Sequence, residues 1–180
     1  MKATGIVRRI DDLGRVVIPK EIRRTMRIRE GDPLEIYTQA DGEVIFKKYS
    51  PINELAEGAT QAAEVICKLG GAPAVIFDRD HVVAVSGVQK KEYSERRISP
   101  ALEDLLENRK SFTYTNDSTH KLTPIEGIDK NALAVFPIIS SGDITGAVAF
   151  MENSDNKKAT EQHKMLAQAA AMFLGKQIEE

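Results

Sequence analysis

Short apolar segments interrupted by polar turns characterise the first thirty residues of the chain. Residues 5–10 and 15–18 are mainly apolar and flank a turn sequence at 11–14, so we expect two strands joined by that turn. Pro19 suits the first position of a helix, and the residues that follow it can continue a helix to Arg27. This stretch therefore predicts a strand, a turn, a strand and a short helix.

A second hairpin pattern follows directly. Residues 34–38 and 44–48 are apolar segments on either side of Asp41 and Gly42, a strong β-hairpin signal. The unit formed by these elements ends near Tyr49. About 50 residues is close to the lower limit for an independent hydrophobic core, and no disulfide or metal motif assists it. We therefore expect two chains to build this unit together as a dimer.

The rest of the chain alternates longer helical and strand patterns. We expect a helix over residues 55–69 that ends at Gly70 and Gly71, a helix that begins at Ser99 and Pro100, and a final helix after Thr160. The expected strands are residues 74–77, 82–85, 112–115, 133–139 and 144–151. This order predicts an α+β domain with an antiparallel sheet and flanking helices. The predicted division is residues 1–50, a linker at 51–56, and a second domain at 55–180.

Charge separates the two parts, although the whole chain has a formal net charge of only −2. Residues 1–29 hold nine basic and three acidic side chains, a local balance of +6. Such an asymmetry indicates that the basic part binds a polyanion, whereas a solvated basic face is the alternative that charge alone leaves open. Helical geometry places four basic side chains within an arc of about 100°. They are Lys20, Arg23, Arg24 and Arg27.

Three motifs in this basic segment resemble the AbrB-type swapped-hairpin DNA-binding domain. The motifs are Gly5-Ile6-Val7-Arg8, Leu13-Gly14-Arg15-Val16-Val17-Ile18-Pro19 and Ile22-Arg23-Arg24. Members of that family interleave the hairpins of two chains, so the resemblance implies an intertwined, β-rich homodimer that binds double-stranded DNA. The DNA-binding positions that it implies are Arg8, Arg15, Arg23 and Arg24. Lys20 and Arg27 share the helix face, and Arg9 alternates to the face opposite Arg8.

The resemblance implies a bacterial transcriptional regulator. Together with the globular second half, it resembles regulators of spore-forming bacteria, which implies control of sporulation genes by activation and repression. Antitoxins use the same small domain, usually followed by a short tail that wraps a toxin. About 130 residues with globular patterning follow it here. An antitoxin-like module that binds a toxin is therefore the alternative rather than the expectation.

The second domain resembles a GAF domain, a fold that senses small molecules. The resemblance rests on the element order together with Phe136-Pro137-Ile138 and Gly142-Asp143-Ile144-Thr145-Gly146. It implies an unidentified small ligand, which we expect near the polar loop at 116–130. The cyclic-nucleotide signature is incomplete, because Gln177 and Ile178 stand where that signature requires acids. A purely structural domain is the alternative.

Narrow apolar stripes on the first and last helices of this domain predict contacts between chains. The first helix carries Leu55, Ala59, Ala62, Ile66 and Leu69 within about 80° of arc, and the last carries Leu166, Ala170 and Phe173 on one face. We expect these helices to join DNA-binding dimers into a homotetramer. A ligand that binds one arrangement better could then shift the spacing of the DNA-binding units.

Catalytic, metal and membrane functions find little support in the sequence. It contains no phosphate-binding loop or nucleophile turn, and its histidines are too far apart in sequence to suggest a zinc motif. We therefore expect neither an enzyme nor a cofactor nor a metal site. The single cysteine, Cys67, and the absence of a long apolar run indicate a cytoplasmic, nucleoid-associated protein without a membrane span. An enzyme with a DNA-binding appendage is the remaining alternative.

Overall fold

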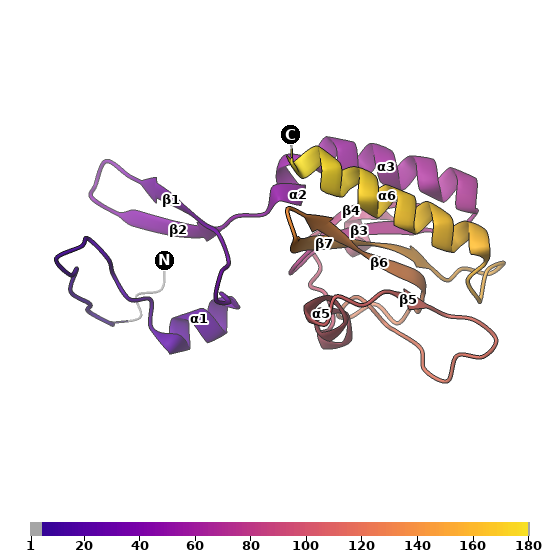
Figure 1. Ribbon diagram of the computed structural model, residues 1–180, viewed down its shortest axis with the longest axis horizontal. Coiled ribbons are helices and arrows are strands. Elements are labelled where there is room, and N and C mark those ends of the chain that lie inside the picture. Colours follow the sequence, from indigo (N-terminus) through magenta and orange to yellow (C-terminus); the bar gives the residue numbers. More distant parts are fainter. Residues whose placement is uncertain (1–4, 180) are drawn as a thin grey trace. The chain divides into compact units, whose positions relative to one another are not determined.

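The computed structural model describes residues 5–179 of the chain (Figure 1). The chain divides into two compact units, Met1–Tyr49 and Ser50–Glu180. Each unit has its own secondary structure and is described separately below.

The first unit contains one helix and one hairpin. Helix α1 is Lys20–Met26, and strands β1 (Leu34–Thr38) and β2 (Val44–Lys48) form an antiparallel pair. The two strands of the hairpin have the predicted bounds. Gly42 adopts the left-handed backbone conformation that the turn between them requires, with a φ of 88°. Pro19 is the N-cap residue, so the helix begins at Lys20, one position later than predicted.

The two strands predicted before this helix do not form within the single chain. The turn between them is present, because the Asp11 N–H donates to the Arg15 carbonyl and the Gly14 N–H donates to the Asp11 carbonyl. Within the part of the chain that the structure describes, no strand pairs with the flanking segments 5–10 and 15–18. Their alternating pattern specifies an extended conformation, but a strand also needs a partner for its backbone groups.

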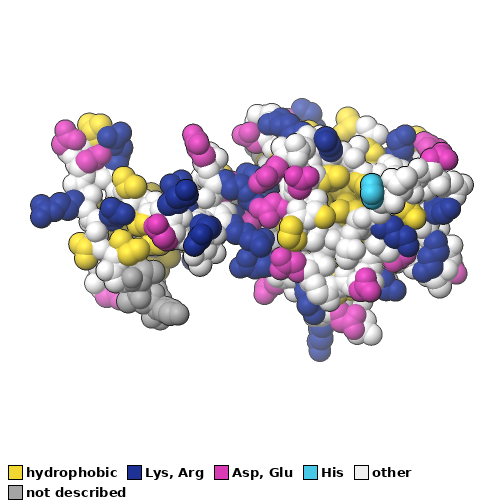
Figure 2. All heavy atoms as spheres, turned by 90° about the horizontal axis from the view of Figure 1, so that it is seen from below, with side chains coloured by type: hydrophobic (Ala, Val, Ile, Leu, Met, Phe, Trp, Pro, Cys, Tyr) yellow, Lys and Arg dark blue, Asp and Glu magenta, His cyan; other side chains and the backbone are white. Residues whose placement is uncertain are grey.

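The first unit therefore leaves much apolar surface uncovered. Within residues 5–49, eleven large apolar side chains are exposed, with Val7 at 90% and Ile10 at 71%. Figure 2 shows apolar side chains at the surface of this unit, beside lysines and arginines. A unit that exposes this much apolar surface lacks a core that one chain can complete.

A five-stranded antiparallel sheet in the order β4-β3-β7-β6-β5 forms the centre of the second unit. Its strands are β3 (Ala74–Asp78), β4 (Val82–Ser86), β5 (Phe112–Thr113), β6 (Ala132–Ser140) and β7 (Asp143–Met151). The helices are α2 (Pro51–Glu54), α3 (Ala56–Gly70), α4 (Lys90–Tyr93), α5 (Pro100–Glu107) and α6 (Glu161–Glu179). The predicted α+β architecture is correct, and only the one-turn helices α2 and α4 were not anticipated.

Both faces of the sheet are covered. Helices α3 and α6 lie side by side on one face, where Ile66 and Leu174 join the apolar cluster around Phe150 (Figure 1). Helix α5 and the long connection at residues 114–131 cover the other face. There Leu102 and Ile125 are buried against the sheet. The connection predicted as a polar loop at 116–130 thus contributes apolar side chains to the second cluster.

Helix ends in the second unit are fixed as the sequence predicts. The Ser99 hydroxyl accepts the Leu102 N–H at the start of α5, and Gly71 ends α3 with a φ of 65°. At the start of α6, the Thr160 hydroxyl accepts the His163 N–H, and His163 Nδ1 accepts the Thr160 N–H. This reciprocal pair is a capping box in which histidine replaces the usual acid.

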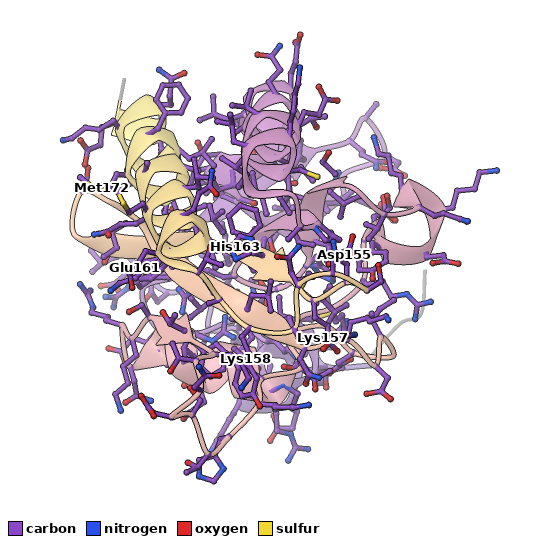
Figure 3. All side chains as sticks on the ribbon, turned by 90° about the vertical axis from the view of Figure 1, so that its right-hand side faces the viewer. Asp155, Lys157, Lys158, Glu161, His163 and Met172 are labelled. Atoms are coloured by element: carbon purple, nitrogen blue, oxygen red, sulfur yellow. The ribbon has the colours of Figure 1, made fainter. Side chains whose placement is uncertain are left out.

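His163 also ties α6 to α3. Its Nε2 lies 2.8 Å from the carbonyl oxygen of Gly70, and because Nδ1 is an acceptor, Nε2 carries the proton and donates it to that carbonyl. The ring is fully buried against Phe150, with 4.9 Å between ring centroids. Figure 3 shows His163 at the start of α6, on the side that faces α3. The end of one helix and the start of the other are therefore held together.

The linker predicted at 51–56 belongs to the second unit. Residues 51–54 form α2, and Ile52 is fully buried among the side chains beneath α3 and α6. The composition of Ser50-Pro51 indicated a connection, but Pro51 instead occupies the first turn of a helix.

Candidate nucleic-acid interface

A tight turn at residues 11–15 holds the first of the predicted DNA-binding arginines. The Asp11 carboxylate accepts the Leu13 and Arg15 backbone N–H groups at 3.0 and 2.8 Å. Its other oxygen accepts the Arg15 Nε at 2.8 Å. Gly14 completes the turn with a φ of 76°. One carboxylate thus fixes both the turn and the root of the Arg15 guanidinium, which remains largely exposed.

These hydrogen bonds lower the pKa of Asp11 below its ordinary value of 3.8, with the Arg15 backbone N–H as the largest cause and the Arg15 side chain next. The folded turn therefore favours the ionised form. Its contribution is fully present above the ordinary pKa and is lost as the pH falls through the lowered one. The Asp11 carboxylate that accepts these hydrogen bonds is consequently ionised at neutral pH.

Helix α1 presents three of its predicted basic side chains to solvent. Lys20, Arg23 and Arg24 are exposed, and the Arg23 Nε donates to the Ile18 carbonyl at 3.2 Å. Arg8 and Arg9 are also exposed, on the segment that precedes the turn. Because that segment is not a strand in the single chain, the predicted alternation of these two arginines between faces is not defined by this structure.

Arg27 does not share the helix face as predicted. It is the C-cap of α1 in a left-handed conformation, with a φ of 52°, and it is half-buried. The Lys48 ammonium donates to its carbonyl at 2.8 Å and lies 3.8 Å from Asp32. The hairpin therefore fixes the end of the helix. Regular helical geometry ends at Met26, so the predicted periodicity does not extend to Arg27.

The stripes predicted to join chains are partly used within one chain. Ala59, Ile66 and Ala170 are buried, because α3 and α6 face each other and the sheet with these positions. Leu55, Ala62 and Leu166 are half-buried. All of these except Leu55 belong to, or pack against, the apolar cluster of their own domain. Of the residues predicted for oligomerisation, only Leu69 and Phe173 are largely exposed, at 55% and 56%.

A different apolar face is open on the same two helices, and the stripe prediction omitted most of it. Besides Leu69 and Phe173, its large side chains are Val65, Met165 and Met172, each more than half exposed. Met172 lies on the outer side of α6 (Figure 3). The signal was available in the sequence, since α6 is apolar nearly all round and a helix of that kind has two faces to cover. We call these five residues the outer helix face.

Among residues 5–179, no three histidine, cysteine, aspartate or glutamate side chains are grouped as a metal ion would require. In the same described part of the chain, no helix combines the length and apolar character that a membrane crossing needs.

Comparison with known protein families identifies the second unit. Residues 54–179 match the family described as stage V sporulation protein T C-terminal, transcription factor. The stage V sporulation protein T of Bacillus subtilis is 50% identical over the full length of both chains. The chain belongs to this family.

The first unit is related to AbrB. The transition state regulatory protein AbrB of Bacillus subtilis is 43% identical over 91 residues, which cover 51% of this chain and 93% of AbrB. Residues 7–53 also match the family described as antidote-toxin recognition MazE, bacterial antitoxin. That match covers only the small domain, whereas the full-length relative is a sporulation protein. The AbrB resemblance is confirmed, and the antitoxin alternative is less well supported.

The second unit has the GAF fold. It resembles the GAF domain of a phosphoenolpyruvate-protein phosphotransferase from Coxiella burnetii, with 16% identity and a TM-score of 0.54 over 69% of this chain and 82% of that domain. The two family relationships confirm the predicted function class. The chain is a bacterial transcriptional regulator with an AbrB-like DNA-binding domain and a GAF-like second domain.

Proposed function

We propose that the exposed arginines of the first unit bind the phosphates of double-stranded DNA and that the protein thereby activates and represses sporulation genes. The observation that carries this proposal is the group of exposed basic side chains on the AbrB-like unit. The principal contacts are Arg8, Arg15, Arg23 and Arg24, with Lys20 beside them and Arg9 and Arg27 in secondary positions. Guanidinium groups suit phosphate because they donate hydrogen bonds in a planar fork.

The DNA-binding unit is proposed to be an intertwined homodimer of residues 1–50. The support is the uncovered apolar surface of residues 5–49 and the two extended segments without a neighbouring strand. A second copy would provide both cover and strand partners. A two-fold dimer would also present its arginines twice, in the symmetry of a DNA duplex.

The second domain, from residue 55 to the end of the chain, is proposed to join two such dimers into a homotetramer. The outer helix face places Val65, Leu69, Met165, Met172 and Phe173 at the surface of α3 and α6. An apolar face on paired helices suits a second copy of itself, because it can then pack symmetrically. Assembly, or an unidentified small molecule bound by the GAF-like domain, would modulate DNA binding.

Regulation without catalysis is the corresponding expectation, because the relatives with matching domains are regulators of transcription. A protein that acts on chromosomal DNA would work in the cytoplasm in association with the nucleoid.

DNA titrations of alanine variants test the proposed interface. Arg8→Ala, Arg15→Ala, Arg23→Ala and Arg24→Ala are each compared with wild type on a duplex that the wild-type protein has enriched from a random pool. Each lost phosphate contact should weaken binding and flatten the plot of log affinity against log salt by about 0.9. Lys130→Ala removes the same charge from an exposed position in the second unit and should leave both quantities unchanged. If all four arginine variants bind with wild-type affinity and salt dependence, DNA binds elsewhere.

A further inference from the structure

The last residue of the first unit and the first residue of the second unit each form a hydrogen bond within their own unit. The Tyr49 N–H donates to the Pro33 carbonyl at 3.0 Å, which extends the hairpin of the first unit to that residue. The next residue, Ser50, donates its hydroxyl to Asp78 at 3.0 Å within the second unit. Two adjacent residues are thus bonded to different units, and the connection between them is a single peptide bond.

Asp78 is unusual among the acidic residues of the second unit because its carboxylate is buried and uses both oxygens. It is only 7% exposed, at the end of β3. One oxygen accepts the Asp80 and His81 backbone N–H groups at 2.7 and 2.6 Å, which closes the β3–β4 turn. The other accepts Ser50 Oγ and the Asn53 amide nitrogen, the latter at 3.3 Å. The same side chain therefore holds a turn and the start of the second unit.

The neighbouring contacts show that this start is rigid. The Asn53 N–H donates to the Ser50 carbonyl at 3.0 Å, and Ile52 between them is fully buried. Hydrogen bonds to an ionised acceptor are among the stronger ones in proteins. The Ser50 side chain makes no capping bond to α2 and instead donates its hydroxyl to Asp78.

We propose that Asp78 is a positioning residue for DNA binding: through Ser50 and Asn53 it clamps the first residue after the DNA-binding unit to the β3–β4 turn. With no slack between Tyr49 and Ser50, a displacement of this turn moves the point at which the DNA-binding unit is attached. Opening the clamp frees this attachment point, and DNA-binding units joined through their second domains should then discriminate less between site spacings. The proposal rests on the proposed function in this last respect.

Hydrogen exchange of the backbone amides of residues 52–55 tests the clamp itself in the full-length protein. Ser50→Ala removes the hydroxyl and should raise exchange in this segment about tenfold, as expected for loss of a hydrogen bond to a charged group. Ser50→Thr retains the hydroxyl and should restore slow exchange. Ser111→Ala, at an exposed position, is the matched control. Asn53→Ala provides a second route to opening if Ser50→Ala does not fold.

DNA binding then tests the positioning role. A short duplex with one enriched site is compared with longer duplexes that carry two sites separated by whole or half helical turns. Ser50→Ala should bind the single site like wild type but lose most of the preference of wild type for one spacing, and Ser50→Thr should recover it. Equal spacing preference in Ser50→Ala and wild type, or unchanged exchange in residues 52–55, would overturn the clamp. Failure of the wild-type protein to bind the single site would instead refute the proposed DNA interface.

Discussion

At the scale of single residues, the two neighbouring acids of the basic segment, Asp11 and Asp12, differ in their contacts. Asp11 lies in the segment proposed to bind DNA, where a negative charge opposes an approaching phosphate. It also accepts hydrogen bonds from the Arg15 backbone and side chain, which its lowered pKa reflects. Asp12, its neighbour, is also exposed. The two carboxylates thus have the same charge and different contacts.

Asp11→Ala should weaken DNA binding about two- to fivefold, although it removes a negative charge from the surface. The reason is that Arg15 and its turn lose the carboxylate that orders them, an effect of the size expected for an exposed ion pair. Asp12→Ala removes the same charge without touching Arg15 and should bind as well as wild type or slightly better. Titrations of one duplex at fixed salt measure both. Stronger binding by both variants would show that charge, and not position, is what Asp11 contributes.

At the scale of elements, two glycines allow close backbone contacts in the second unit, one between α6 and the sheet and one between neighbouring strands. A Cβ on Gly175 of α6 would lie 2.2 Å from the carbonyl oxygen of Ile139 in β6, and one on Gly146 of β7 would lie 2.0 Å from that of Phe77 in β3. Gly58 in α3 has open space around the same position. Helix glycines in this domain therefore differ in whether a methyl group can be accommodated.

Gly175→Ala should destabilise the second unit by about 1–3 kcal/mol, because backbone atoms that cannot rotate away block the added methyl group. Gly58→Ala should stabilise it by about 0.5–1 kcal/mol through reduced freedom of the unfolded chain. Chemical denaturation of the two full-length variants, followed by helix signal, checks the pair. Equal stability of the Gly175→Ala variant and wild type would mean that α6 can move away from β6 at no cost.

Local chemistry predicted most elements correctly. The Asp41-Gly42 hairpin, the Ser99 and Thr160 caps and the strands at 133–139 and 144–151 each depend on neighbours in sequence, and the structure agrees within a residue or two. The strands expected at 5–10 and 15–18 depend on a partner for their backbone groups, and no described segment of the chain pairs with them. Arg27 does not continue the basic face of α1, because the helix ends at Met26 and Arg27 has a left-handed backbone conformation.

Contacts between residues far apart in the sequence could not be predicted from the sequence pattern. Ala59 and Ala170 form apolar stripes, but periodicity does not state whether the partner helix belongs to the same chain or to another. Asp78 reads as part of a turn, Asp78-Arg79-Asp80, and the same pattern gives no sign that its second oxygen binds residues 25 and 28 positions earlier. Turn chemistry is local, whereas this clamp depends on the tertiary path.

At the scale of the whole molecule, the chain exposes two separate apolar surfaces. One belongs to residues 5–49 and the other is the outer helix face of α3 and α6. Because they lie on different compact units, the associations proposed for them are independent. One can be removed while the other persists.

Phe173→Glu should abolish the larger assembly and leave DNA-binding dimers. A charge at the centre of an apolar contact lacks a partner and costs far more than the contact yields. Light scattering should show half the wild-type mass, while a single-site duplex is still bound. Thr119→Glu adds the same charge on an exposed loop and should keep the wild-type mass. Unchanged mass for Phe173→Glu would place the contact between dimers away from this face.

The exposed apolar residues of the first unit also bear on how the cell can use its supply of this protein. If a functional reader of DNA exists only when two chains have met, its amount rises with the square of the chain concentration while chains are scarce. A twofold change in synthesis then becomes a fourfold change in occupancy of a weak operator. By requiring a second chain to cover them, Val7 and Ile10 would thus make transcription of a target gene respond steeply to a small change in the concentration of this protein.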